Sequence, residues 1–447
     1  MVSSQPDPVA AERFIPIPVV RLELSKAEPP ETNQHGQLVA LVTIHGVPLG
    51  VLSILDGQPC SPEELISLAA DRFQESLHDH LERDGISSKG LAGALSSSPE
   101  GACARRLPTS PRRVSVVVCT LGQDLRLVQT VTSILNQSHA DLELLVVDNA
   151  PASGCARTLL AGLHDPRLKI VEEPRRGLSA ARNAGLARAT GGVVAFTDDD
   201  AYAEAHWLQS LLAPFDDHES VVCTTGLVLP AELETRAQLF FEEFGGFDKG
   251  FERLVWSIDV PSWPPALGKP GAGSALHPFS PGVYGSGNNM AFRVDWLRSQ
   301  TLFDEALGAG SLTRGGEDLD AFLRVMLSGK YLVYEPRAIV RHHARRDMAG
   351  LHAQMYSYGS GLSASIVKHL LSSPRTAWSI VVRTPAGLRR MLDPGSEKNA
   401  GRTAAFPSSL KRAELRGFAV GPLLYARARL RLRSRRRFSH GQRIGAI

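Results

Sequence analysis

Three consecutive aspartates are the residues of this chain best suited to chemistry. Asp198, Asp199 and Asp200 follow the apolar run 193–197, whose β-branched and aromatic residues predict a buried strand. Open α/β sheets bind ligands at the carboxyl ends of their strands. Adjacent like charges repel, so we expect a cation there, and a divalent metal that also binds phosphate oxygens fits a carboxylate cluster. The alternative is a solvated acidic turn after a strand.

Two other segments could bind a nucleotide. Asp148 ends the apolar run 142–147, where a carboxylate can accept a hydrogen bond from a base or ribose; the alternative is an Asx cap on the following loop. The segment 176–185 predicts a helix start that is capped by Ser179 and preceded by Gly177. Free N–H groups at a helix start attract anions. Arg182 would add charge-assisted hydrogen bonds to phosphate, unless it only pairs with a neighbouring acid.

A second acidic cluster lies at the predicted start of a later helix. Glu317 and Asp318 follow two glycines, which would let another molecule approach closely. Acids also favour this position because of the helix dipole, without any catalytic role. His342 and His343 follow the predicted strand 338–340. A histidine near a carboxylate site can bind a metal, although isolated histidines usually do not.

These side chains need a sheet whose strand ends lie together. Strands are predicted at 114–119, 142–147, 168–171 and 193–197, and helices at 125–135, 152–163 and 180–189. Repeated βαβ units imply a mostly parallel sheet with right-handed crossovers. The predicted fold class is therefore α/β, over residues 114–345.

Other regions flank this one. Residues 1–85 predict a small α+β accessory domain, with a helix that begins at Ser61 as cap, Pro62 in the first position and Glu64 completing a capping box. We identify no catalytic cluster in it. The Gly-, Ser- and Pro-rich residues 86–113 predict a flexible linker. Residues 346–447 predict a helical extension with a basic tail.

Composition narrows the class of protein. The 447 residues are 43% hydrophobic with a net charge of +3, which suits a globular protein and gives no argument for nucleic acid. Five scattered cysteines without a C-x-x-C pair suggest neither a zinc site nor a disulfide framework. We find no signal peptide and no apolar stretch of transmembrane length. The expected location is cytoplasmic.

Taken in order, these motifs resemble the family 2 glycosyltransferases, an inverting family with a GT-A fold. The resemblance covers about residues 114–345. It depends on six pieces in sequence order: Val116–Thr120, Val146–Asn149, Gly177–Gly185, Phe196–Asp200 with Trp207-Leu208 behind it, Gly287–Arg293 and Gly316–Asp318. Each piece is weak alone, and their order makes the match specific.

The resemblance implies roles for individual residues. Asp318 would be the general base, with Glu317 beside it, and Asp200 would be the most direct ligand of Mn²⁺ or Mg²⁺. The nucleotide sugar, most simply a UDP-sugar, would contact Thr120, Asp148, Gly177, Arg182, Asn183, Asp198 and Asp199. The metal would bind Asp198, Asp200 and His342, and the acceptor side would include Asn288, Asn289 and Gly316.

The implied chemistry is a single displacement at the anomeric carbon. A base must reach the acceptor hydroxyl, and the departing diphosphate needs stabilisation of its charge. The acceptor would be a saccharide or a lipid-linked sugar, and the usual setting of the family is cell-envelope polysaccharide or glycolipid assembly. One departure concerns Leu121-Gly122-Gln123, where many relatives carry a polar or basic run, so one nucleotide contact is in question.

Other functions fit less well. A metal-dependent phosphatase would place its D-x-D after an earlier strand, and a sugar nucleotidyltransferase would carry a glycine-rich basic loop after its first strand. A non-catalytic carbohydrate- or lipid-binding relative would not need all the acids present here. The tail 425–443 contains eight arginines and no acid, which suggests peripheral attachment to an anionic membrane. A disordered basic tail is the alternative, and nucleic-acid binding lacks an aromatic platform.

Overall fold

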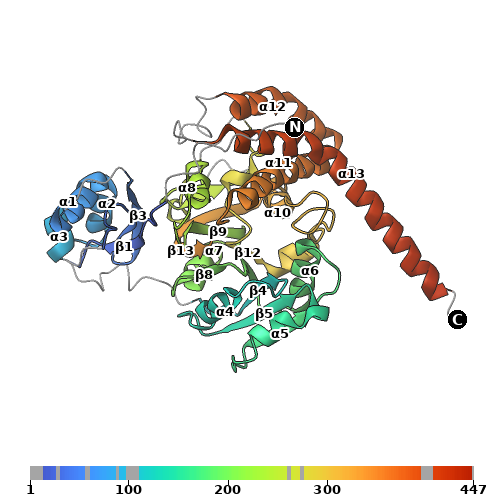
Figure 1. The fold of residues 1–447 in the computed structure, drawn as a ribbon, viewed down its shortest axis with the longest axis horizontal. Coiled ribbons are helices and arrows are strands. Elements are labelled where there is room, and N and C mark those ends of the chain that lie inside the picture. Colours follow the sequence, from blue (N-terminus) through green and yellow to red (C-terminus); the bar gives the residue numbers. More distant parts are fainter. Residues whose placement is uncertain are drawn as a thin grey trace, which may run out of the picture. The chain divides into compact units, whose positions relative to one another are not determined.

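The computed structural model describes residues 14–26, 31–55, 61–86, 90–96, 110–258, 263–271, 276–393 and 406–444. The chain forms two compact units (Figure 1). The first contains residues 1–104 together with 230–242 and 344–351, and the second contains 105–229, 243–343 and 352–447. A short segment of the predicted catalytic region, 230–242, and a second at its border with the predicted helical extension, 344–351, thus group with the N-terminal unit.

The first unit is a three-stranded sheet with helices against it. Its strands β1 (Val19–Glu23), β2 (Leu38–Ile44) and β3 (Val47–Ile54) lie in that order, with β1 and β2 parallel and β2 and β3 antiparallel. Helices α1 (Pro62–Arg72), α2 (Gln74–Arg83) and α3 (Gly90–Ser96) lie beside it (Figure 1). The predicted capping box is confirmed, because Ser61 and Glu64 exchange both bonds. Helix α3 lies in the segment predicted as linker, and its Ala94 is buried in the core.

The second unit is built on a ten-stranded sheet. The central path runs β11-β10-β13-β9-β12-β7-β4-β5-β6, and β8 (Ala201–Ala203) pairs with β13. The strands on this path are β4 (Val114–Thr120), β5 (Leu142–Asp148), β6 (Leu168–Glu172), β7 (Val193–Asp198), β9 (Val221–Pro230), β10 (Leu254–Trp256), β11 (Lys269–Pro270), β12 (Met290–Arg293) and β13 (Tyr331–His342).

The predicted α/β class is confirmed, with one refinement of the sheet. Strands β4, β5, β6 and β7 pair in parallel, as the βαβ pattern predicted. The pairings of β12 with β7 and β9 are antiparallel. The sheet is therefore parallel in the half that carries the early motifs and mixed beyond it.

Helices connect and cover these strands. They are α4 (Leu127–Leu135), α5 (Cys155–Leu159), α6 (Leu178–Arg188), α7 (Trp207–Asp217), α9 (Val294–Ser299) and α10 (Glu317–Leu327). Helix α8 (Arg236–Glu243) follows β9 in the sequence, and nearly all of it groups with the first unit. The apolar face of α4 and the buried ring of Trp207 on α7 pack on the sheet residues Val116 and Leu144 in one core. Burial of this apolar surface is the main force that holds the strand ends in place.

The predicted helical extension is present. It consists of α11 (Met348–Leu370), α12 (Pro374–Leu392) and α13 (Ser408–Ile444), which lie together in Figure 1. Helices α11 and α13 approach closely through glycine: a Cβ at Gly359 would collide with the carbonyl of Glu414, and one at Gly417 with the carbonyl of Tyr356. Among the described residues, no helix has the length and apolar character needed to span a membrane.

Candidate active site

The sheet register brings the early motifs to one edge. Thr120 at the end of β4 is the register partner of Asp148 at the end of β5. On the other side of β4, Cys119 is the partner of Asp198 at the end of β7. Because these three strands are parallel, their carboxyl ends meet at the same edge of the sheet. The predicted grouping of Thr120, Asp148 and the aspartates is thus present in the structure.

A short hydrogen bond ties Thr120 to the aspartate cluster. The Thr120 hydroxyl donates to Asp199 Oδ2 at 2.6 Å and accepts from the Gly122 N–H at 2.8 Å. Burial is the main cause that raises the pKa of Asp199 to about 7; the charges of Asp200 and Asp198 act in the same direction, and the Thr120 bond opposes them.

The unusual loop after β4 has a structural reason. Gly122 adopts φ +71°, a left-handed conformation that favours glycine. A Cβ there would also collide with the backbone N of Ala156 in α5. The loop therefore makes a tight turn that packs against α5, and a long basic side chain at position 122 would not fit.

Asp148 and Asn149 organise the loop that leads into α6. Asp148 is 3% exposed, and its Oδ1 accepts from the Ala150 N–H at 2.9 Å, which is the Asx-type bond considered as the alternative. Asn149 donates to the carbonyls of Glu173 and Arg175, both at 2.8 Å, and accepts from the Gly177 N–H at 2.8 Å. Our sequence argument assigned Asn149 no role, although it stands in the same Val-Asp-Asn motif.

Arg182 differs most from its predicted environment. Its side chain is 3% exposed and its guanidinium donates to Glu317 Oε1 at 2.8 Å and to the Gly287 carbonyl at 3.0 Å. Asp198 Oδ1 lies 3.6 Å from the same group. The rings of Phe196 and Phe303 flank it, at 5.8 and 5.7 Å. Arg182 therefore bridges the two acidic clusters, which matches the alternative that it pairs with neighbouring acids.

Two helix α6 predictions need correction. Asn183 was predicted to contact the nucleotide sugar, but its amide exchanges two hydrogen bonds of 2.9 Å with the backbone of Phe303. Ser179 was predicted as the helix cap, but Gly177 holds that position and the Ser179 hydroxyl donates to the Leu307 carbonyl at 2.8 Å. Both side chains fasten α6 to the segment 303–307 because that segment has backbone groups that would otherwise be buried unpaired.

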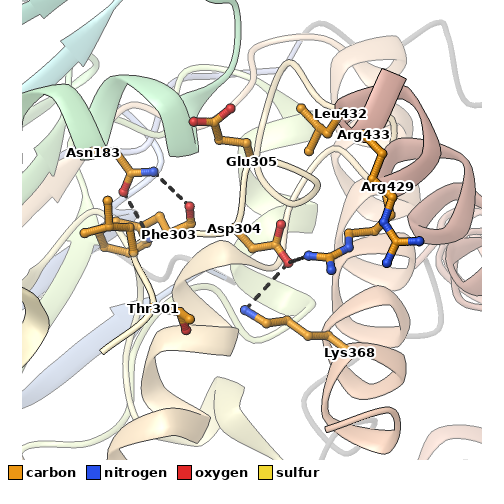
Figure 2. A pocket seen from close by; sticks show the side chains of 10 residues that line it. Asn183, Thr301, Phe303, Asp304, Glu305, Lys368, Arg429, Leu432 and Arg433 are labelled. Atoms are coloured by element: carbon orange, nitrogen blue, oxygen red, sulfur yellow. Dashed lines mark hydrogen bonds and ion pairs between the residues drawn. The ribbon is translucent and has the colours of Figure 1, made fainter. Parts of the chain in front are cut away.

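Asn183 and Phe303 also border a cavity of about 450 Å³, which contains none of the predicted catalytic acids. Figure 2 shows Asp304 facing Lys368 of α11 and Arg429 of α13. Their nitrogens lie 3.7 and 3.6 Å from Asp304 Oδ2, and the Tyr425 hydroxyl donates to it at 3.0 Å. These contacts join the helical extension to the sheet domain.

The second acidic cluster begins helix α10. Asp318 accepts from the Gly287 N–H through Oδ2 at 2.9 Å and from the Leu319 N–H through Oδ1 at 2.8 Å. Glu317 is 5% exposed. Burial raises its pKa to about 7, and the charge of Asp318 adds to the rise while Arg182 opposes it. The two neighbouring acids thus have different environments, one held by backbone N–H groups and one paired with a buried arginine.

The adjacent asparagines 288 and 289 have opposite surroundings. Asn289 is fully buried, accepts from Trp207 Nε1 at 2.8 Å, and donates to the carbonyls of Leu227 and Ala338 at 2.9 and 2.8 Å. It cannot also contact an acceptor, so that prediction is corrected. Asn288 is 2% exposed, and neither its Oδ1 nor its Nδ2 has a hydrogen-bond partner in the protein. Such an amide is unusual in a native structure and indicates a missing partner.

Gly316, also predicted on the acceptor side, has a packing role. It caps α10 with φ +93°, and a Cβ there would collide with the Gly361 carbonyl of α11. The two glycines before Glu317 were expected to admit another molecule. At Gly316 the molecule that approaches is the protein's own helix.

The predicted metal ligands are partly assembled. Asp200 Oδ1 and His342 Nε2 lie 3.4 Å apart, and both side chains are about nine-tenths buried. The ligand atoms of Asp198, Asp200 and His342 do not all lie within 4.8 Å of one another. A carboxylate and an imidazole at this spacing suit one divalent cation such as Mn²⁺. The donor set fits a metal, with Asp198 as a further ligand only after its side chain moves.

Part of the chain is similar in sequence to known glycosyltransferases. Residues 115–267 match the family model described as Glycosyl transferase family 2. A glucosyl-dolichyl phosphate glucuronosyltransferase of Haloferax volcanii is 33% identical over 147 residues, which cover 31% of this chain and 47% of that protein. A pre-mycofactocin glycosyltransferase of Mycobacterium tuberculosis is 29% identical over 267 residues, covering 59% and 50%.

The chain thus spans about half the length of these curated relatives. Among solved structures, a mannosyltransferase from Pyrobaculum calidifontis in complex with GDP-Man and Mn²⁺ aligns with a TM-score of 0.45 at 18% identity. That alignment covers 71% of this chain and 88% of the mannosyltransferase.

Proposed function

We propose that the chain is an inverting glycosyltransferase, and the match of residues 115–267 to the family model described as Glycosyl transferase family 2 supports this. It moves a sugar from a nucleotide-diphosphate donor to a hydroxyl of a saccharide or lipid-linked acceptor. The donor is a UDP-sugar and the mechanism is a single displacement. Asp318 is the general base.

The observation that carries this proposal is the link between the two acidic clusters. Arg182 contacts both Glu317 and Asp198, so the donor edge of the sheet and the start of α10 share one buried cation. A base must lie within hydrogen-bond reach of the acceptor proton. Asp318 is held in a fixed orientation by two backbone N–H groups, which suits a group that must meet a hydroxyl beside the donor sugar.

Each proposed site residue has a separate role in the reaction. Asp318 takes the proton of the acceptor hydroxyl as that oxygen attacks the anomeric carbon. Thr120, Asp148 and Asp199 face the nucleotide and ribose, and Gly177 at the start of α6 gives the diphosphate a close approach to backbone N–H groups. Arg182 keeps its place between Glu317 and Asp198 and contributes positive charge to the site without leaving either acid.

We also propose that the active site binds a divalent metal ion. Asp200 and His342 would hold Mn²⁺ or Mg²⁺, with Asp198 beside them, and the metal would supply neutralisation of the departing diphosphate. The side-chain oxygen and nitrogen of Asn288 have no hydrogen-bond partner in the protein and are available to a substrate. We assign Asn288 to binding of the transferred sugar or of the acceptor substrate.

Two features of the helical extension support a proposal for the acceptor and the setting. On α13 the large apolar side chains of Leu423 and Leu430 are 53 and 61% exposed, and arginines alternate along the same helix. We propose that this helix attaches the chain peripherally to an anionic membrane at about 1 kcal/mol per basic residue, where a lipid-linked acceptor of cell-envelope assembly would be found. Deletion of residues 425–447 should then abolish co-sedimentation with anionic vesicles.

Calorimetry with UDP, GDP and dTDP, each with and without Mn²⁺, tests the donor site. Tight, metal-dependent binding of one nucleotide supports the proposal and selects the sugars for a turnover assay. In that assay Asp318→Asn should reduce turnover by about 10²- to 10⁴-fold and leave nucleotide binding nearly intact.

Asp295→Asn is the matched control, because Asp295 is an exposed acid in the first turn of α9. Full turnover by Asp318→Asn would remove Asp318 from the role of base. A failure of every nucleotide to bind would instead favour a non-catalytic carbohydrate-binding relative.

A further inference from the structure

The N-terminal unit contains a cluster of two histidines and an aspartate that lies outside the active site. His80 and Asp84 are four residues apart at the end of α2, so they lie on one helix face. His45 belongs to the two-residue turn between β2 and β3, where it has φ +52° and Gly46 has φ +77°. This unit carries no glycosyltransferase motif.

Three potential ligand atoms of these residues converge. His45 Nδ1 lies 2.9 Å from Asp84 Oδ2 and 3.1 Å from His80 Nε2, and His80 Nε2 lies 3.4 Å from Asp84 Oδ2. The three side chains are between 0 and 4% exposed. Among the described residues, this is the one group of three such side chains whose ligand atoms all lie within 4.8 Å of one another.

The spacing of the triangle matches a coordination polyhedron. Zinc bonds to imidazole and carboxylate of about 2.0–2.2 Å place two tetrahedral ligands about 3.3 Å apart, and two adjacent octahedral ligands about 3.0 Å apart. The observed edges of 2.9, 3.1 and 3.4 Å span these two values. A site with two imidazoles and one carboxylate favours a first-row transition metal over Mg²⁺ or Ca²⁺.

A single cation at the centre of this triangle would contact the two ring nitrogens and the carboxylate oxygen at once. The geometry of the three atoms therefore suits one shared ion.

Hydrogen bonds to the Glu23 carboxylate fix the turn that carries His45. Glu23 accepts from the backbone N–H groups of His45 and Gly46 at 2.8 and 2.9 Å, and from the Thr43 hydroxyl at 2.9 Å. The imidazole is therefore fixed at the end of a rigid hairpin, facing a helix end that is fixed by the core. Supporting contacts of this kind orient the ligands of metal sites.

We propose that His45, His80 and Asp84 bind a divalent transition-metal ion, for which Zn²⁺ is the probe, and that the ion cross-links the β2–β3 turn to the end of α2. The protein supplies three ligands, and at least one coordination position is left for another donor. This ion is separate from any metal at Asp200 and His342. Its role is to stabilise the N-terminal unit, because metal binding to a preformed site adds to folding free energy.

The test uses the full-length chain, stripped with a chelator and titrated with Zn²⁺ against a chromophoric competitor. Wild-type protein and Asp200→Asn should both bind zinc in the N-terminal unit. His80→Gln should bind about one equivalent less than wild type. The matched control is His78→Gln: His78 lies on the same helix and pairs with Glu82 at 3.2 Å, but its side chain is 34% exposed. It should bind as wild type does.

Two further measurements on folded protein keep the test decisive if His80→Gln misfolds. Saturating Zn²⁺ should raise the thermal unfolding temperature of Asp200→Asn, and Co²⁺ should give visible absorption bands typical of nitrogen and oxygen ligands. Zinc binding by His80→Gln and by His45→Asn equal to that of wild type would overturn the proposal. So would the absence of bound zinc and of any thermal shift in Asp200→Asn.

Discussion

Replacement of Gly287 by alanine is the perturbation that probes the active site most directly. Gly287 donates its N–H to Asp318 and its carbonyl accepts from Arg182. A Cβ at this position would lie 2.9 Å from Asp318 Oδ2, 3.0 Å from Asp318 Cβ and 3.1 Å from an Arg182 nitrogen. The added methyl group would thus press on the proposed base and on the bridging arginine together.

The size of the effect follows from these distances. Ordinary van der Waals contact begins near 3.4 Å, so Asp318 must move by about 0.5 Å. Insertion of a methyl group into a packed region costs about 1–3 kcal/mol. The hydrogen bond from the Gly287 N–H to the carboxylate contributes about 1.5–3 kcal/mol when intact. Since a misplacement of about 1 Å can reduce a rate about 10²-fold, we expect turnover to fall about 10- to 100-fold.

The assay is donor turnover with the nucleotide sugar selected by calorimetry, with the thermal unfolding temperature measured in parallel. Gly282→Ala is the control, because a Cβ at Gly282 meets nothing within 4 Å, and it should behave as wild type. Nucleotide binding by Gly287→Ala should weaken less than turnover falls, because the added methyl group lies closer to Asp318 than to Arg182, the residue that contacts Asp198. Wild-type turnover by a folded Gly287→Ala would refute the argument that this backbone positions Asp318.

Three other changes test the surrounding network. Thr120→Val removes the bond that lowers the pKa of Asp199. Since an ionised carboxylate accepts hydrogen bonds from the nucleotide or ribose more strongly than a protonated one, nucleotide binding in wild type should strengthen as pH rises through about 7. In Thr120→Val it should strengthen only at higher pH when calorimetry is repeated from pH 6 to 9. Asn149→Ala loses three hydrogen bonds, so urea denaturation should show a loss of about 1.5–4 kcal/mol and calorimetry weaker nucleotide binding. Asn288→Ala removes two unpaired buried polar atoms, so it should not lower the free energy of unfolding in the same denaturation assay, and it should raise the KM for the acceptor substrate. Asn289→Ala should instead destabilise the protein by several kcal/mol.

Local pattern was enough to predict the sheet edge. The alternation of apolar runs and helical segments predicted β4, β5 and β7, and parallel pairing then required their carboxyl ends to meet. Thr120, Asp148 and Asp198 lie together for that reason. The capping box of α1 was also predictable, because both of its bonds are made within four residues.

Local pattern was not enough where a side chain bonds far along the chain. Arg182 and Glu317 are separated by 135 residues, and Asn183 and Phe303 by 120. An arginine in the first turn of a helix is equally suited to a phosphate and to a buried acid, and only the folded chain decides between them. His45 and His80 are likewise 35 residues apart, so the spacing of His80 and Asp84 alone gave no sign of a third ligand.

The pair Asn288 and Asn289 shows what burial adds to a motif. Both residues are alike in sequence and both are buried, yet only Asn289 is satisfied, by groups on three other elements of the sheet domain. An unpaired buried donor or acceptor costs about 1–3 kcal/mol, so two such atoms on Asn288 are a substantial penalty for the protein alone. A substrate hydroxyl that both accepts from the amide and donates to its oxygen would remove that penalty. Asn289 therefore belongs to the scaffold, and we propose that a ligand completes the environment of Asn288.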